Sequence, residues 1–240
     1  GSDSLAGEAA AALDPRLARV AAPLPSFVPN ADALAAGADV ARDHPAPPGP
    51  EARHPPPAAD AFAAAAGRAG VDAGTFVIAY GSPGAERLWW LLRHFGHDAC
   101  AVLVGGLDAW GGPLRGGGER IERRAFVARA RDDDTATLDE LAARLDDPRL
   151  VLVDTRVASR FRGEANPIDR VPGRIPGAVS APWSEPPPAL PGGDLVAYCG
   201  SGVTACVVLH RLSLAGRDGR LYAGSWSEWE QRPELPRASG

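Results

Sequence analysis

The sequence predicts an α/β protein made of two related domains, each an open, mostly parallel sheet flanked by helices. Three observations predict this class. Short apolar runs bounded by turn residues are typical of strands that are buried on both faces. Helical patterns alternate with these runs, as they do in parallel sheets. The whole alternation also occurs twice, in residues 76–110 and again in residues 195–229.

The two copies match position by position. Gly105 is equivalent to Gly224 and Trp110 to Trp229, and both pairs are 119 residues apart. A spacing of this size indicates a duplicated domain, because solenoid repeats are far shorter. The chain has 240 residues, which is enough for two domains of ordinary size. We therefore predict a first domain over 1–121, a polar linker over 122–136 and a second domain over 137–240.

In the first copy, "TFVIAY" (75–80) is predicted to be a strand and "AERLWWLLRHFG" (85–96) a helix that closes on a C-terminal glycine. The part of this domain before the strand is short and degenerate, and its candidate remnants are residues 12–16 and 23–28. The proline-rich stretch 44–57 is interpreted as a long loop within the same domain.

In the second copy, the capping-box pattern "TLDE" (137–140) predicts a helix over 138–145. "LVLVDTR" (150–156) and "DLVAY" (194–198) are apolar runs typical of buried parallel strands. "TACVVLHRLSLAG" (204–216) follows as a helix that again closes on a glycine.

The composition excludes several classes of function. The chain has 25 basic and 30 acidic residues, and its net charge of -5 at pH 7 argues against a general nucleic-acid binder. No apolar stretch is long enough to cross a bilayer, so we expect no membrane span. Three cysteines without a CxxC pair make neither a disulfide framework nor a zinc site, which favours a reducing, cytoplasmic location. No histidine pair has metal-ligand spacing with a third ligand, so we expect surface and helix-end roles for histidine, and neither a metal nor another cofactor.

Cys199 lies where a predicted strand ends and a predicted helix begins. In open parallel sheets, ligands bind beyond the carboxyl ends of the strands, which is where this thiol is placed. Glycines at 200 and 202 let the backbone curl back, and we expect the helix to begin at about residue 203 or 204. The free N–H groups of residues 200–204 then point inward at the sulfur.

These donors and the helix dipole favour a negative sulfur, which lowers the thiol pKa and makes the thiolate a nucleophile. The hydroxyls of Ser201 and Thr204 supply further donors. Such a cradle suits a thiolate or a persulfide anion. The predicted cradle around Cys199 consists of Gly200, Ser201, Gly202, Val203 and Thr204.

The ordinary role of a free cysteine is that of a small core hydrophobe. We assign this role to Cys100 and Cys206, because one begins a short strand and the other falls inside an apolar helix. Cys199 differs, since strand end, tight turn and helix start coincide there. The equivalent turn of the first copy has Gly81 instead. The first domain is therefore predicted to keep the scaffold and to lack the nucleophile.

At this point the chain resembles the two-domain rhodanese-type sulfurtransferases, and most of all the 3-mercaptopyruvate sulfurtransferases. The resemblance covers about residues 52–236. The motifs that carry it occur in the right order: "ARHPPP", "ERLWWLLRHFGH…VLVGGLDAW", "VDTRVASRFRG…GRIPGAVSAPW", "CGSGVT" and "LYAGSWSEW".

The resemblance implies tandem rhodanese-like domains and sulfur transfer. The catalytic cysteine of the family takes a sulfur atom from a donor, holds it as a persulfide and passes it to a thiophilic acceptor such as cyanide, a small thiol or thioredoxin. It places this chemistry on Cys199, and it places the arginine that binds the carboxylate of the donor on Arg160. A guanidinium fork matches a carboxylate bidentately, although without the motif Arg160 is equally a surface residue or part of a structural ion pair.

Three departures from the family pattern leave alternatives open. A second arginine is missing from "EANPIDR", where Ile168 is nearest to its position, and Arg174 stands where histidine is usual. No aspartate or histidine of the first domain can be assigned as a partner of Ser201. The alternatives are a thiosulfate sulfurtransferase and a non-catalytic sulfur-carrier or binding module. A phosphatase of related fold needs a longer loop closed by an arginine, whereas this loop runs into Ala205 and Cys206.

Overall fold

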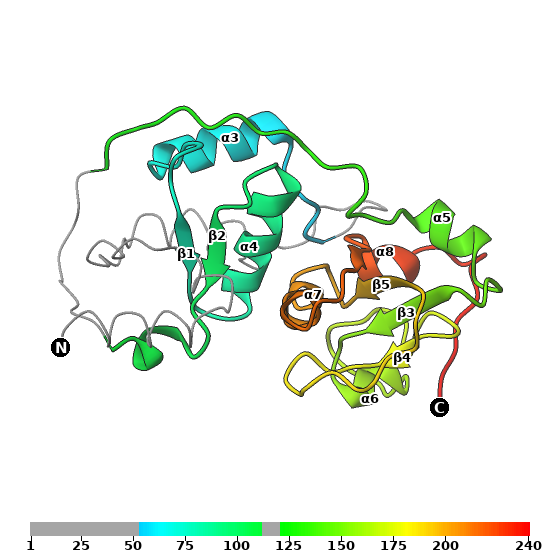
Figure 1. The fold of residues 1–240 in the computed structure, drawn as a ribbon. Helices are drawn as coiled ribbons and strands as arrows, with labels where there is room; N and C mark the ends of the chain where they lie inside the picture. The colour runs from blue at the N-terminus through cyan, green and yellow to red at the C-terminus, as the bar shows by residue number, and fades with distance from the viewer. Residues whose placement is uncertain (1–52, 112–120) are drawn as a thin grey trace. The chain divides into compact units, whose positions relative to one another are not determined.

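The computed structural model describes residues 53–111 and 121–240, which form parts of two compact units (Figure 1). The first unit contains residues 57–111 and 121–131 of the described chain, and the second contains 53–56 and 132–240. The sequence analysis had placed 53–56 in a loop of the first domain. The candidate strand remnants 12–16 and 23–28 lie outside the residues that the structure describes.

The first unit contains one strand–helix–strand motif. Its β1 and β2 are parallel, with Val77 opposite Cys100, and α4 packs against both strands (Figure 1). Helix α4 is followed by Gly96, whose φ of 85° provides the left-handed turn expected of a C-terminal glycine. The predicted strand and helix of this copy are confirmed. The elements are α3 (Ala59–Arg68), β1 (Val77–Ala79), α4 (Gly84–His94), β2 (Cys100–Val102) and the 3-10 helix η2 (Gly106–Ala109).

The second unit is a four-stranded parallel sheet with the strand order β4-β3-β5-β6. Strand β5 lies in the interior of this sheet, and α7 packs against β5 and β6 (Figure 1). The elements in chain order are α5 (Leu138–Ala143), β3 (Leu150–Asp154), α6 (Ala158–Phe161), β4 (Val179–Ser180), β5 (Asp194–Tyr198), α7 (Ala205–Leu214), β6 (Arg220–Leu221) and α8 (Ser225–Trp229).

The apolar runs of the sequence become the core of this unit. In both β3 and β5, every residue after the first is buried, as expected for parallel strands covered on both faces. Trp226 and Trp229 of α8 are fully buried in the same core as Leu152 and Val196. The buried aromatic rings fix α8 against the sheet, which places the end of "LYAGSWSEW" beside the end of β5.

The capping box of α5 is only half formed. The backbone N–H of Glu140 donates to Thr137 Oγ1 at 3.2 Å, as predicted. The carboxylate of Glu140, however, accepts hydrogen bonds from Arg220 (2.6 Å) and Arg144 (2.9 Å). The charge of two arginines outweighs a single backbone N–H as a partner for this carboxylate.

The helix-end role expected for histidine is confirmed for His94, which is the last residue of α4, but the surface role is wrong. His94, His97 and His210 are buried, at 8%, 6% and 3% exposure. His94 stacks on Trp90 with ring centroids 4.8 Å apart, so packing on aromatic rings explains its burial.

No helix within the described residues is long and apolar enough to cross a membrane.

Candidate active site

The site lies at the carboxyl end of the central parallel strand of the second unit. Strand β5 ends at Tyr198 and α7 begins at Ala205, so the loop between them consists of residues 199–204. Strands β3 and β6 flank β5, and their carboxyl ends open on the same edge. This is the edge at which ligands bind in open parallel sheets.

The loop wraps around the sulfur of Cys199. The backbone N–H of Gly202 donates to Sγ at 3.0 Å and that of Ser201 at 3.4 Å. The sequence analysis expected such donors from residues 200–204, and the structure gives them from two of these residues. The thiol is buried, at 2% exposure. A buried sulfur surrounded by N–H donors is a site for negative charge.

Burial by itself raises the pKa of the Cys199 thiol, but hydrogen bonds from the Thr204 hydroxyl and from N–H groups outweigh it. The resulting pKa lies below the usual value of a cysteine. The contributing N–H groups, in order, are those of Ser201, Ala205 and Gly202. Donation to the charged form stabilises the thiolate, which is the nucleophilic form of cysteine.

Gly202 is required by the shape of this loop. Its φ is 83°, a left-handed conformation that side chains disfavour. A Cβ atom at this position would lie 2.8 Å from the carbonyl oxygen of Ala223, which belongs to the backbone and has little freedom to move. The close approach of the two backbones holds the Gly202 N–H on the sulfur.

The motif at the end of β6 fastens the base of the loop. Ser225 Oγ accepts from the N–H of Cys199 at 3.2 Å and donates to the carbonyl of Tyr222 at 2.9 Å. Two further backbone bonds of 3.0 Å run from Trp226 N to Cys199 O and from Ser227 N to Gly200 O. Together these contacts fix the backbone that carries the thiol.

Ser225 was missed by the sequence analysis. It is the one non-glycine residue with positive φ, at 55°, among those described. The repeat offers the signal in hindsight, because the offset that pairs Gly105 with Gly224 pairs Ser225 with Gly106, whose φ is 66°. The second copy keeps a serine where the first uses a glycine, at the cost of backbone strain.

Arg160 lies at the loop, as the resemblance led us to expect, but it also has a carboxylate partner. Its Nε donates to Asp169 Oδ2 at 2.8 Å and its Nη2 donates to Asp169 Oδ1. Burial raises the pKa of Asp169, and the hydrogen bond and charge of Arg160 outweigh this and hold the pKa below its usual range. Nε and Nη2 thus face Asp169, while Nη1 lies 3.4 Å from the position of a Cβ at Gly200.

A second arginine, Arg53, also reaches the loop. Its Nη2 donates to the carbonyl oxygen of Gly200 at 3.2 Å, and its backbone N–H donates to Ser227 Oγ at 3.2 Å. In the sequence this residue stands out only as part of the motif "ARHPPP". Because 147 positions separate Arg53 from Gly200, no local pattern in the sequence indicates the contact.

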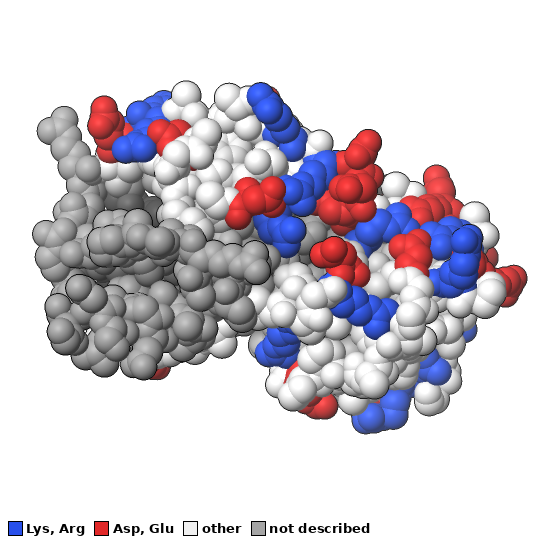
Figure 2. All heavy atoms as spheres, in the orientation of Figure 1, with Lys and Arg blue, Asp and Glu red and all other residues white. Residues whose placement is uncertain are grey.

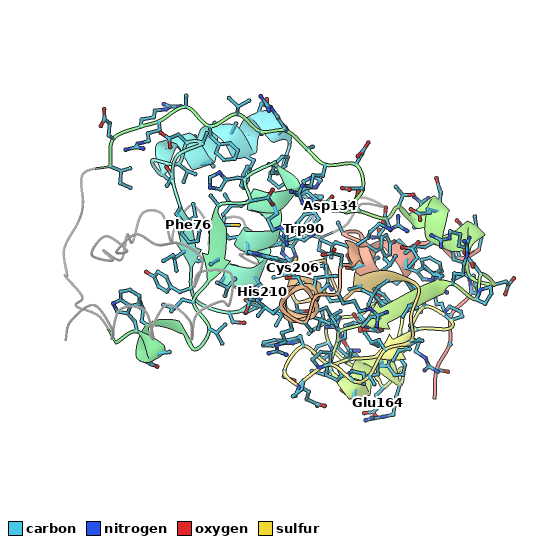
Figure 3. All side chains as sticks on the ribbon, viewed as in Figure 1. Phe76, Trp90, Asp134, Glu164, Cys206 and His210 are labelled. Carbon is cyan, nitrogen blue, oxygen red and sulfur yellow. The ribbon has the colours of Figure 1, made fainter. Side chains whose placement is uncertain are left out.

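The other two cysteines are buried, as predicted for core residues. Cys100 is 7% exposed at the start of β2, and Cys206 is fully buried on α7 (Figure 3). All three cysteines are free thiols. In the part of the chain that the structure describes, no group of histidine, cysteine and acidic side chains is arranged to hold a metal ion.

Comparison with known proteins first identifies the class of the second unit. A family model described as a rhodanese-like domain matches residues 137–232. The Tum1 protein of Saccharomyces cerevisiae has a similar fold, with a TM-score of 0.68 and 21% identity over 80% of this chain and 78% of Tum1. An EanB variant in complex with ergothioneine also gives a TM-score of 0.68, with 21% identity over 77% of this chain and 55% of EanB.

Relatives in sequence extend this to the whole chain. It is 41% identical to a protein of Pseudomonas aeruginosa named probable 3-mercaptopyruvate sulfurtransferase, over 85% of this chain and 82% of the relative. It is 37% identical to the human 3-mercaptopyruvate sulfurtransferase, over 75% of this chain and 70% of the human protein. A Mycobacterium tuberculosis protein named provisionally as a thiosulfate sulfurtransferase is 34% identical over 78% of this chain and 75% of its own length. The chain belongs to the rhodanese-type sulfurtransferase family, among the enzymes similar to 3-mercaptopyruvate sulfurtransferase.

Proposed function

We propose that the chain transfers a sulfur atom from 3-mercaptopyruvate to a thiophilic acceptor through a persulfide on Cys199. The observation that carries this proposal is the loop around the thiol. Two N–H groups donate to the sulfur, and the pKa of the thiol is lowered in spite of its burial. A core cysteine needs no such donors, whereas a thiolate and a persulfide anion both do.

In the proposed first half-reaction, the Cys199 thiolate attacks the sulfur of 3-mercaptopyruvate. A sulfur–sulfur bond forms while the carbon–sulfur bond of the donor breaks. The electron pair of the broken bond goes to the carbon, giving the enolate of pyruvate, which takes up a proton and leaves. In the second half-reaction, an acceptor thiolate or cyanide takes the outer sulfur and the Cys199 thiolate is restored.

The residues of the loop suit both anions in this cycle. The N–H groups of Ser201 and Gly202 donate hydrogen bonds to the Cys199 sulfur, and they can donate in the same way to the persulfide anion. The hydroxyl of Ser201 is proposed to donate to the carbonyl oxygen of the donor, where negative charge develops in the enolate. The single O–H of Thr204, which donates to the thiolate, is proposed to turn to the same oxygen as the charge leaves the sulfur. Arg160 is proposed to bind the donor carboxylate. Its loss in Arg160→Ala should cost about 2–4 kcal/mol of transition-state binding, within the range for truncating one partner of a buried charge pair.

We assign catalysis to the predicted second domain, residues 137–240, and a structural role to the predicted first domain, residues 1–121. The equivalent turn of the first unit carries Gly81 and no thiol. It is also shorter, because residues 80–83 separate β1 from α4 whereas residues 199–204 separate β5 from α7. Residues 122–136 are the proposed linker. The three free thiols support a reducing, cytoplasmic location.

Thiosulfate is the second candidate donor. The M. tuberculosis relative is named for it, and two arginines near Gly200 favour anions in general. Its outer sulfur would go to Cys199, and sulfite would leave with the electron pair of the sulfur–sulfur bond.

The acceptor is proposed to be a small thiol, cyanide or a thioredoxin-like protein. If the chain were a non-catalytic binding module, neither donor would transfer a sulfur atom to the Cys199 thiol. A phosphatase is disfavoured, because the loop is followed directly by Ala205 and Cys206 at the start of α7 and offers no arginine there.

The proposal is tested by intact-mass measurement after treatment with 3-mercaptopyruvate. The wild-type protein should gain the mass of one sulfur atom and lose it again when a reductant is added. Cys199→Ser should gain none, while Cys100→Ser and Cys206→Ser serve as matched controls and should gain one. Appearance of the added mass in the Cys199→Ser protein would refute the assignment.

A further inference from the structure

Arg53 approaches the catalytic loop and forms no direct ion pair with a carboxylate of residues 53–111 or 121–240. Its Nη2 donates to the carbonyl of Gly200 at 3.2 Å, and its Nη1 lies 3.4 Å from the carbonyl oxygen of Ile168. Both acceptors are neutral. Its Nε is buried and has no hydrogen-bond partner within the described part of the chain. The Nε atom is inaccessible to a ligand, but each terminal nitrogen has a second N–H group, so the charge and these donors are available for an anion.

The neighbouring arginines differ from Arg53 in this respect. Arg156 pairs with Asp154 at 2.6 Å and with Asp169 at 3.3 Å, and Arg160 shares Asp169. The two carboxylates of Asp154 and Asp169 thus pair with Arg156 and Arg160, and neither pairs with Arg53.

Glu230 is a further carboxyl group whose pKa Arg53 affects. Burial, followed by repulsion from Asp169, raises that pKa, while Arg53 lowers it. The Glu230 carboxylate accepts from the backbone N–H of Val171 at 3.0 Å, and among the described residues it forms no ion pair with Arg53. Among the side chains that the structure describes, one positive charge beside the loop therefore has no paired carboxylate.

The two arginines converge on one side of Gly200. A Cβ atom built there would lie 2.9 Å from Arg160 Nη2 and 3.0 Å from Arg53 Nη2. The absence of a side chain at this position lets both guanidinium groups reach the backbone of the residue that follows the nucleophile. Only a glycine allows this approach without displacing one of them.

We propose that Arg53 and Arg160 together bind the carboxylate of the sulfur donor, with Arg53 supplying the charge that Asp169 cancels at Arg160. This inference rests on the proposed function and names a second donor-binding residue for the same site. Two guanidinium forks hold one carboxylate in a defined orientation, which one fork already engaged with Asp169 does not.

The charge balance favours a monoanion. One uncompensated guanidinium matches the single carboxylate of an α-keto acid better than it matches the dianion thiosulfate. Acidic and basic side chains are interspersed over the drawn face of the second unit (Figure 2). Recognition by individual arginines, rather than by a broad basic surface, agrees with a small donor.

The test compares Arg53→Ala and Arg53→Lys with the wild-type protein in steady-state kinetics. Arg53→Ala should raise KM for 3-mercaptopyruvate about ten- to hundredfold, the change expected for losing a hydrogen-bonded charge, with kcat nearly unchanged. Arg53→Lys should raise KM less than Arg53→Ala does, because lysine keeps the positive charge but lacks the two-pronged guanidinium group. Arg162→Ala is the control, since it removes an arginine paired with Glu164 at 2.7 Å on the exposed surface, and its KM should not change.

Transfer from the preformed persulfide to a neutral thiol distinguishes binding from support of the loop. This half-reaction needs no donor carboxylate, so Arg53→Ala should leave its rate unchanged. An equal loss in both half-reactions would mean that Arg53 only holds the loop, and an unchanged KM would mean that it binds no donor. An effect confined to thiosulfate would overturn the assignment to a carboxylate. If Arg53→Ala does not fold, Arg53→Lys and Gly200→Ala, which displaces both guanidinium groups, make the same comparison.

Binding of pyruvate to Cys199→Ser, measured by calorimetry, separates this inference from the proposed function. Adding Arg53→Ala should weaken pyruvate binding at least about tenfold, the loss expected for a charge-assisted hydrogen bond. Equal affinities in the two proteins would overturn the inference even if the wild-type enzyme loads sulfur. A wild-type protein that gains no sulfur from either donor would refute the proposed function, while the pyruvate comparison would still decide the role of Arg53.

Discussion

The hydroxyl of Ser225 accepts a hydrogen bond from the backbone N–H of Cys199, with 3.2 Å between oxygen and nitrogen. The serine holds this position with a φ of 55°, which a glycine would adopt without strain. The equivalent residue of the first copy is Gly106, and the equivalent of Cys199 there is Gly81. Serine and thiol are therefore present together in one copy and absent together from the other.

This pairing predicts different outcomes for two substitutions of Ser225. Ser225→Ala removes the partner of a buried N–H and keeps the strain, so it should lower the free energy of unfolding by about 1–3 kcal/mol. Ser225→Gly also removes the partner but relieves the strain, which should recover about 1 kcal/mol. Both variants should load sulfur more slowly by a similar factor, because both release the backbone of Cys199. Chemical denaturation and single-turnover loading test this, and a Ser225→Gly protein as fast as wild type would show that the hydroxyl does not position the thiol.

Thr204 should set the acid limit of activity. Its hydroxyl makes the largest of the contributions that lower the pKa of Cys199, so Thr204→Val should raise this pKa. The thiolate reacts and the thiol does not. Loading therefore falls as the pH drops through the pKa, and in Thr204→Val it should fall at higher pH than in wild type.

The same pKa has a consequence for stability. A folded-state pKa below the unfolded value contributes stability that is complete above the unfolded pKa and is lost as the pH falls through the folded pKa. Thr204→Val should reduce this contribution. Thiolate absorbance against pH measures the shift directly. Ser213→Ala is the matched control, because Ser213 lies in the last turn of the same helix and donates to the carbonyl of His210 at 3.0 Å. A pH profile of Thr204→Val that coincides with that of the control would contradict the prediction.

The two glycines of the loop should respond differently to alanine. In Gly202→Ala the new methyl group meets the backbone oxygen of Ala223 at 2.8 Å in a left-handed conformation, so both stability and kcat should fall. In Gly200→Ala the three atoms nearest to the methyl group belong to the ends of the flexible side chains of Arg53 and Arg160. The Tm should stay near that of wild type while the donor KM rises. Thermal denaturation and steady-state kinetics compare the two, and a KM effect in neither variant would argue against donor binding at Gly200.

The first unit should not gain activity from a thiol alone. A side chain added at Gly81 would point into open space, since nothing lies within 4 Å of its Cβ position, and the turn there is shorter than the catalytic loop. Gly81→Cys in a Cys199→Ser background should therefore acquire no sulfur from the donor. Intact-mass analysis decides this. A doubly substituted protein that gains one sulfur and turns over at a rate comparable to wild type would show that the scaffold, rather than the wrapped loop, activates the thiol.

The elements that local patterns specify were predictable from the sequence. Strand β5 matches the predicted run 194–198, and α7 begins one residue beyond the predicted start at Thr204. Apolar runs and glycine turns carry this information because burial on both faces of a parallel strand leaves no room for polar residues. The same argument located the Cys199 loop at the end of the strand.

The parts that depend on distant contacts were not predictable. Arg53 meets Gly200 across 147 positions of sequence, and no periodicity links the two. Asp169 pairs with Arg160 within a stretch that the sequence analysis examined only for a second arginine. A serine with positive φ gives no local signal, since strain of this kind is maintained by the surrounding structure.

The choice of donor is the last prediction, and it follows from the charges at the loop. The sequence analysis expected little positive charge there, because Gly200 and Ser201 are neutral. The structure adds Arg53, whose charge is expected to strengthen the binding of anions of both kinds. Asp169, however, is paired with Arg160, so within the described part of the chain the arginine at the loop that lacks an ion-pair partner is Arg53.

A monoanionic α-keto thiol needs one carboxylate anchor and neutral donors near its carbonyl group, and we propose that the arginines and the loop hydroxyls supply these. Thiosulfate carries two charges on a compact group and leaves one of them unmatched. We therefore expect kcat/KM for 3-mercaptopyruvate to exceed that for thiosulfate. Asp169→Asn provides an internal check, since removing this carboxylate frees the charge of Arg160 and should shift the preference toward the dianion. Steady-state kinetics with both donors measures the two ratios. A kcat/KM for thiosulfate equal to or above that for 3-mercaptopyruvate in the wild-type enzyme would reverse the donor assignment and leave the persulfide chemistry of Cys199 in place.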